Sequence, residues 1–256
     1  MKVDLKLITN ICITSISLSV LLGSFLNILG PISQSNIMNR KANKIGLKSR
    51  SIKNELAQKK SDLLFFYNNK LERFERLDNL IKKWESLISK NPDLNVSCSF
   101  LSLDRKFYAE INSDFSLPAA SSIKVPILII LLTMLDRGEI LWDERLVLTE
   151  DTIGGGSGWM AYQKIGEKFP IFEVATEMIR VSDNTATNLL IKRLGGINTI
   201  NQRFKEIGLK KTQINNFLPD LDGTNLTSTK DLSLAMAQVD NGNLLSFSSR
   251  DIFREI

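Results

Sequence analysis

An almost wholly apolar segment at residues 121–137 is the feature that most constrains the fold of this chain. Residues 127–132 read Ile-Leu-Ile-Ile-Leu-Leu, without a polar side chain among them. A helix that is apolar on every side is stable only when other elements bury it nearly all round. Pro126 falls in its first turns, where proline is tolerated. The segment therefore predicts a central helix around which a domain is built.

A small sheet and several shorter helices are predicted around this central helix. Residues 95–103 and 106–111 read as two strands of a hairpin that turns at Asp104-Arg105. Helices are predicted at residues 171–181, 184–194, 197–207 and 231–239. The glycines of residues 154–158 match no phosphate-binding or dinucleotide-binding fingerprint, so this stretch reads as a flexible loop.

Residues 51–89 carry a heptad pattern that predicts one long amphipathic helix. Tyr67, Phe74, Ile81 and Ile88 recur every seven residues, and charged residues fill the other faces. Two interpretations stay open. The helix packs on the domain that follows it, or it forms a short coiled coil that joins two copies of the chain in a homodimer.

The first 60 residues predict a membrane-directed end followed by a basic linker. Residues 7–39 contain no charged residue, which is typical of a signal peptide or a single membrane anchor, and we expect an uncleaved anchor. Residues 40–60 then hold eight basic residues against one acid. The chain is therefore divided into 1–39 as leader or anchor, 40–92 as linker and amphipathic helix, and 93–256 as the globular domain.

Composition excludes several kinds of active site and partner. The chain has no histidine, which excludes a Ser-His-Asp triad, a Cys-His pair and a histidine-bound zinc site. Its two cysteines, Cys12 and Cys98, have no metal-ligand spacing, and no cofactor is expected. The net charge of +5 originates in the basic linker, and no basic face with interleaved aromatic residues predicts nucleic-acid binding. A nucleophilic serine here needs another base, and lysine is the main alternative.

Ser121 and Lys124 are the candidates for such a pair. They form the only S-x-x-K of the sequence and stand at the start of the central helix. Residues three apart lie on one helix face, and backbone N–H groups at a helix N-terminus stabilise an oxyanion. Burial lowers the pKa of a lysine, so that its amine can accept the serine proton. Taken alone, the motif is equally explained by an N-cap serine and a surface lysine.

A second motif, Ser182-Asp183-Asn184, lies sixty-one residues after Ser121. Asp183 by itself reads as the N-cap of the helix that follows. The two motifs in this order and at this distance, together with the residues around 185–196, resemble the active-site motifs of class A β-lactamases and penicillin-binding proteins.

The resemblance covers about residues 96–256 and implies a mixed α/β (α+β) fold, with a sheet-and-helix domain, an all-helical lobe and the active site between them. It implies that Ser121 is the acylated nucleophile and Lys124 a base. Ser182 would pass a proton to the leaving β-lactam nitrogen, Asn184 would bind the substrate's side-chain amide, and Asp183 would be structural. The implied substrates are β-lactams or the D-Ala-D-Ala end of cell-wall peptides. The implied location is periplasmic or extracytoplasmic, where the anchor expected from residues 7–39 would hold the chain at the membrane.

One departure from the family pattern concerns removal of the acyl group. Class A enzymes carry Glu-Pro-x-Leu-Asn in a loop after these helices, and that glutamate activates the deacylating water. The similar stretch here, residues 217–222, reads Phe-Leu-Pro-Asp-Leu-Asp, so that aligning the prolines puts Leu218 at the glutamate's position. Asp220 and Asp222 are candidate substitutes. We therefore expect slow deacylation.

A second departure is that the sequence contains no Lys-Thr-Gly, which the family carries on a strand of its central sheet. We expect that this chain stops before that strand, that its sheet has only two strands, and that its fold is largely helical and its activity impaired. Three functions stay open: a class A β-lactamase-type serine hydrolase, active in antibiotic resistance; a penicilloyl-binding or D-Ala-D-Ala peptidase-like protein that acylates without turnover; and a non-catalytic, membrane-tethered envelope protein.

Overall fold

The apolar segment forms a central helix, as predicted. In the computed structural model, which describes residues 74–256, a 3-10 turn, η1 (Ala120–Ile123), leads directly into α4 (Lys124–Asp136). Ten of the 13 residues of α4 are buried. Because these residues lie on every side of the helix, no side of α4 faces solvent before its last turn.

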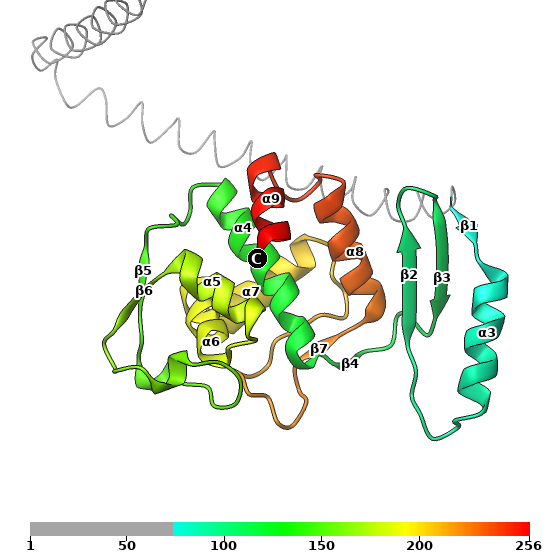
Figure 1. Cartoon of the computed structure of the whole chain (residues 1–256), viewed down its shortest axis with the longest axis horizontal. Coiled ribbons are helices and arrows are strands. Elements are labelled where there is room, and N and C mark those ends of the chain that lie inside the picture. The colour runs from blue at the N-terminus through cyan, green and yellow to red at the C-terminus, as the bar shows by residue number, and fades with distance from the viewer. Residues whose placement is uncertain (1–73) are drawn as a thin grey trace, which may run out of the picture. The chain divides into compact units, whose positions relative to one another are not determined.

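Five further helices of the described residues contact α4 and form a helical lobe. They are α5 (Ile171–Arg180), α6 (Asn184–Arg193), α7 (Gly196–Glu206), α8 (Thr229–Asp240) and α9 (Phe247–Glu255). Figure 1 shows α4, in green, running among them. The four helices predicted in this region correspond to α5 through α8, and each predicted end lies within two residues of the observed one.

The predicted hairpin is confirmed and belongs to a larger sheet. β2 (Cys98–Ser102) pairs antiparallel with β3 (Phe107–Ile111). A short strand, β1 (Glu75–Arg76), pairs in parallel with the other edge of β3, so the strand order is β1-β3-β2. α3 (Asp78–Ser89) contacts β3, and α8 contacts β2, so that helices lie against this sheet on both sides (Figure 1).

The predictions of one continuous helix over residues 51–89 and of a two-stranded sheet are both wrong within the described residues. The helix begins only at Asp78, because the chain before it is extended and adds β1 to the sheet. Leu77 N–H donates to Tyr108 O of β3 at 2.8 Å. In a longer helix the same N–H would donate to a carbonyl of the helix itself. Ile81 of α3 is only 3% exposed, which agrees with the interpretation of a helix packed on the domain.

Two short ribbons fix the loops of the helical lobe. β4 (Leu117–Pro118) pairs with β7 (Leu226–Thr227), and β5 (Arg145–Val147) pairs with β6 (Lys168–Pro170). Next to the first pair, Ala119 N–H donates to Asn225 O at 2.7 Å. The loop at residues 215–225 is therefore anchored directly beside the turn that carries Ser121.

The predicted leader or anchor and the basic linker lie outside the described residues. The described residues all belong to one compact unit. None of the helices in residues 74–256 has the length and apolar character needed to cross a bilayer. The mixed α/β and largely helical fold predicted from the sequence is confirmed.

Candidate active site

The amine of Lys124 lies at the centre of the predicted site. Lys124 Nζ donates hydrogen bonds to Ser121 Oγ at 3.2 Å, to Ser182 O and Oγ at 2.8 Å each, and to Asn184 Oδ1 at 2.9 Å. Ser182 Oγ in turn donates to Ser121 Oγ at 2.9 Å. The structure therefore brings all four predicted site residues into one hydrogen-bonded group.

The backbone around Ser121 explains why its side chain meets that of Lys124. Ser121 is the second residue of η1 and Lys124 the first residue of α4, so the two side chains lie one turn apart on the same side. Ala120 immediately before them has a φ of 45°, a conformation that non-glycine residues rarely adopt. The Ser121 N–H donates to no acceptor within residues 74–256, which leaves this amide available for an oxyanion.

Burial makes the amine of Lys124 easier to deprotonate than that of a free lysine. The residue is 2% exposed, and its removal from water lowers its pKa to about 8, although the negative charge of Asp183 opposes this shift. In the described part of the chain, Lys124 is the only titratable side chain hydrogen-bonded to Ser121. A neutral amine that can accept the Ser121 proton is therefore present at mildly alkaline pH.

Asp183 holds the turn before α6 and does not touch Ser121. Its Oδ1 accepts from Ala186 N–H at 2.8 Å and so caps α6, as predicted. Its Oδ2 accepts from the backbone N–H groups of Trp159 and Met160 at 2.8 and 2.9 Å. All three partners are backbone donors, so the buried carboxylate has a structural position.

Both the oxygen and the nitrogen of the Asn184 side-chain amide form hydrogen bonds. Asn184 Oδ1 accepts from Lys124, while Nδ2 donates to Gly155 O at 2.8 Å. A primary amide carries two N–H donors. The second one has no acceptor among the residues that the structure describes, so it is available to a ligand.

The loop that carries Leu218 is fixed to α6 by Asn188. Asn188 Oδ1 accepts from Leu218 N–H at 2.8 Å, and its Nδ2 donates to Leu218 O at 2.7 Å. Leu218 is 6% exposed, and its peptide bond to Pro219 is cis. The position where the family resemblance expects a glutamate therefore holds a buried apolar side chain, and Asn188 lies one helical turn beyond Asn184.

The two aspartates of this loop do not take the place of that glutamate. Asp220 accepts from Thr224 Oγ1 at 2.9 Å and from Asn225 N–H at 2.5 Å. Burial raises the pKa of Asp220, but these hydrogen bonds outweigh it and hold the pKa below its ordinary value. Asp222 is exposed. Asp220 therefore closes its own loop, and within residues 74–256 neither carboxylate accepts a hydrogen bond from Ser121.

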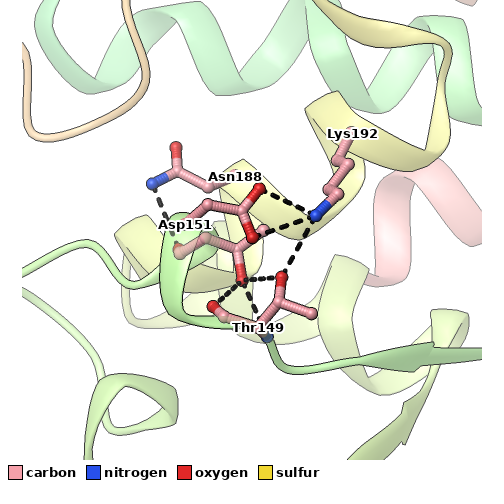
Figure 2. A network of polar contacts seen from close by, with 5 residues as sticks. Thr149, Asp151, Asn188 and Lys192 are labelled. Carbon is pink, nitrogen blue, oxygen red and sulfur yellow. Dashed lines mark hydrogen bonds and ion pairs between the residues drawn. The ribbon is translucent and has the colours of Figure 1, made fainter. Parts of the chain in front are cut away.

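One face of α6 also binds the segment that leads to the glycine-rich loop. Lys192 forms an ion pair with Asp151 at 2.7 Å, and Asn188 donates to Thr152 O at 3.3 Å (Figure 2). The ion pair is half-exposed, so its own contribution to stability is small. Together with the contact of Asn184 with Gly155, these contacts recur every four residues along one side of the helix, so the segment runs antiparallel to α6.

Comparison with known proteins identifies the family of this chain. A family model described as the β-lactamase enzyme family matches residues 77–256. The chain belongs to the β-lactamase enzyme family.

Several β-lactamases and a protein named PBP-A are among the similar proteins. The structure of PBP-A is 42% identical with a TM-score of 0.68, and the match covers 70% of this chain and 67% of PBP-A. A leucine-to-glutamate variant of PBP-A, solved as an acyl-enzyme complex with penicillin G, matches equally well. The β-lactamase VEB-1 of Pseudomonas aeruginosa is 24% identical over 147 residues, which is 53% of this chain and 48% of VEB-1. The chain spans about half the length of the curated relatives it matches.

Sequence reasoning located four residues of this β-lactamase-family site and missed the residue that ties its loops together. Ser121, Lys124, Ser182 and Asn184 converge, and the roles assigned to them stay predictions. Asn188, which is 1% exposed, was missed. Its signal in the sequence is the spacing of four residues from Asn184 on a helix. In the described residues, no cluster of three or more His, Cys, Asp or Glu side chains is placed to hold a metal ion.

Ser182 has a φ of 59°, a left-handed conformation that is unfavourable for residues with a Cβ. We expect Ser182→Gly to be more stable than Ser182→Ala by about 1 kcal/mol, because both variants lose the hydroxyl and only alanine keeps the backbone strain. Urea unfolding measures the difference. At Ser122, whose φ is not positive, the order should reverse and alanine should be the more stable. Equal stabilities of the two Ser182 variants would show that the strain is absent.

Proposed function

We propose that this chain is a serine enzyme of the class A β-lactamase type, which opens the β-lactam ring by forming an acyl-enzyme on Ser121. The observation that carries the proposal is the buried Lys124 amine, hydrogen-bonded to both Ser121 and Ser182. Neutral Lys124 takes the proton of Ser121 while Oγ bonds to the carbonyl carbon. The backbone N–H of Ser121 then stabilises the oxyanion.

The second half of acylation breaks the bond between the carbonyl carbon and the ring nitrogen. Ser182 Oγ lies 2.9 Å from Ser121 Oγ and 2.8 Å from Lys124 Nζ. It therefore donates its proton to the leaving nitrogen and regains one from protonated Lys124. The nitrogen ends as an amine, Lys124 ends neutral, and the acyl group stays on Ser121. Asn184 binds the amide of the substrate's side chain.

A second candidate function is a penicillin-binding or D-Ala-D-Ala peptidase-like protein that acylates without rapid turnover. The buried Leu218 favours it, because an apolar side chain supplies no base for the water that would remove the acyl group. The similarity to PBP-A also supports this candidate, because a variant of that protein was solved as an acyl-enzyme complex with penicillin G, which shows that a protein similar to this chain is acylated by a penicillin. In this case the acyl group remains on Ser121 for long times.

We propose that the protein is located outside the cytoplasm and that its N-terminal segment is a leader or a membrane anchor. The support is the family membership and the uncharged run at residues 7–39.

The test is the intact mass of the full-length protein, followed over time with penicillin G. We expect a mass gain of one penicillin, located on Ser121 by peptide mapping. Ser121→Ala should lose the adduct, and Ser122→Ala should keep it as the matched control. An adduct that decays within minutes supports the hydrolase, and an adduct that persists for hours supports the second candidate. No adduct on folded protein would refute both and leave the non-catalytic alternative.

A further inference from the structure

The glycine-rich stretch at residues 154–158 is a loop, as predicted, but it packs tightly on the Ser-Asp-Asn turn. Asn184 Nδ2 donates to Gly155 O at 2.8 Å. A Cβ placed on Gly158 would lie 2.0 Å from the carboxylate of Asp183. A side chain is therefore excluded at Gly158 by the close approach of this backbone to the site, whereas a Cβ on Gly155 would have no neighbour within 4 Å.

The position of the loop backbone is fixed from the side of α6. Thr185 Oγ1 accepts from Gly154 N–H at 3.0 Å and donates to Gly154 O at 3.2 Å. Thr185 is fully buried at 0% exposure. Since these bonds hold Gly154 at its backbone, the carbonyl of the next residue, Gly155, is a fixed acceptor.

This acceptor determines the orientation of the Asn184 amide. The amide oxygen faces the donors of Lys124, and one hydrogen of Nδ2 is used by Gly155 O. Rotating the amide by half a turn would place its NH₂ against the Lys124 amine and its oxygen against a carbonyl, and both contacts would be repulsive. The second Nδ2 hydrogen is therefore presented in one fixed direction.

We infer that Gly155 and Gly156 are positioning residues that set the preference of this site for acyl donors with a side-chain amide. The inference rests on the proposed function and names the substrate feature that the site selects. Gly155 supplies the carbonyl, and the absence of a side chain at Gly156 leaves room for the Asn184 amide. A donor whose side chain carries an amide oxygen accepts the remaining N–H of Asn184. A donor without that amide gains nothing from this arrangement.

The test compares two substrates on one variant. A Cβ at Gly156 would lie 3.2 Å from Asn184 Nδ2, at a φ of 99°. We expect Gly156→Ala to lower the acylation rate constant (rate over substrate concentration) for penicillin G by about 3- to 10-fold, the worth of one hydrogen bond. For 6-aminopenicillanic acid, which has no acyl side chain, the acylation rate constant of Gly156→Ala should stay within about twofold of the wild-type value. Time-resolved intact mass on the full-length protein measures both.

The matched control is Gly166→Ala. Gly166 has a φ of 90° and nothing within 4 Å of its would-be Cβ, so this variant carries the same backbone strain away from the site. It should lose a similar amount of thermal stability and acylate with both substrates at wild-type rates. A substrate-selective loss in Gly166→Ala would overturn the inference, because strain alone would then explain the effect.

A second variant keeps the inference testable if Gly156→Ala does not fold. Thr185→Val removes the hold on Gly154 without adding an atom to the loop, and it should produce the same loss for penicillin G alone. An equal loss for both substrates, or no loss for either, would overturn the inference while leaving acylation of Ser121 intact. A wild-type protein that is acylated by neither substrate would instead refute the proposed function and this inference with it.

Discussion

Lys124→Met is expected to slow acylation of Ser121 by penicillin G by about 100- to 10,000-fold, which is the usual contribution of a general base. Methionine fills a similar volume in the buried site but cannot accept a proton. No other titratable group in the described residues is hydrogen-bonded to Ser121, so no neighbour takes over the role. Time-resolved intact mass gives the rate.

The wild-type protein should also show a pH dependence that this variant lacks. The pKa of Lys124 is lowered to about 8 by burial. Below that pH the amine is protonated and cannot accept the serine proton, and above it the amine is neutral. The acylation rate should therefore rise with pH through a midpoint near 8 and then level off. In Lys124→Met this midpoint should disappear.

Lys192→Met is the matched control for both measurements. Lys192 lies on α6, half-exposed and paired with Asp151, and has no contact with Ser121. Its variant should keep the wild-type acylation rate and pH midpoint. A Lys124→Met protein that folds and still acylates at the wild-type rate would show that Lys124 is not the base.

Leu218→Glu is expected to accelerate loss of the acyl group from Ser121 by at least about 100-fold. Leu218 is buried, and burial raises the pKa of an introduced carboxyl towards neutral, where it serves as a base for water. Asn188 holds Leu218 through its backbone N–H and C=O, so the substitution leaves that hold in place. The decay of the penicillin G adduct, followed by intact mass after excess penicillin is removed, measures the change.

Leu218→Gln separates base catalysis from loosening of the loop. Glutamine has the size of glutamate and a similar burial cost, but it cannot take up a proton. We expect the two variants to lose similar thermal stability, because both bury a polar group. Only the glutamate variant should deacylate quickly. Equal acceleration in both variants would mean that water entry limits the wild-type protein, and no acceleration in either would place the side chain away from the ester.

Local patterns in the sequence were sufficient for the elements that carry the nucleophile. α4 could be predicted because its residues are apolar on every side, which only a central helix allows. The contact between Ser121 and Lys124 followed from their three-residue spacing at the start of that helix. The contact between Ser121 and Ser182 was predicted from a family motif. No local rule predicts a contact between residues sixty-one positions apart.

The strand β1 and the role of Asn188 could not be predicted, for different physical reasons. β1 has two residues, too few to show the alternation that identifies a strand, and it lay inside an apolar heptad pattern. Asn188 pairs with Leu218 across 30 residues of sequence. A buried asparagine needs some partner, but the sequence does not tell which backbone group provides it. Such pairings depend on how the loops fold over α6.

The hydrogen bonds from α6 to the loops that contain Leu218 and Gly154 affect how this site can change in evolution. Asn188 and Thr185 bind Leu218 and Gly154 only through backbone atoms. Every amino acid other than proline offers the same N–H and C=O groups. Where no side chain is crowded, the loop residues can therefore vary without losing their place. New chemistry at position 218 can be acquired by one substitution, while the helix that holds the loop stays the same.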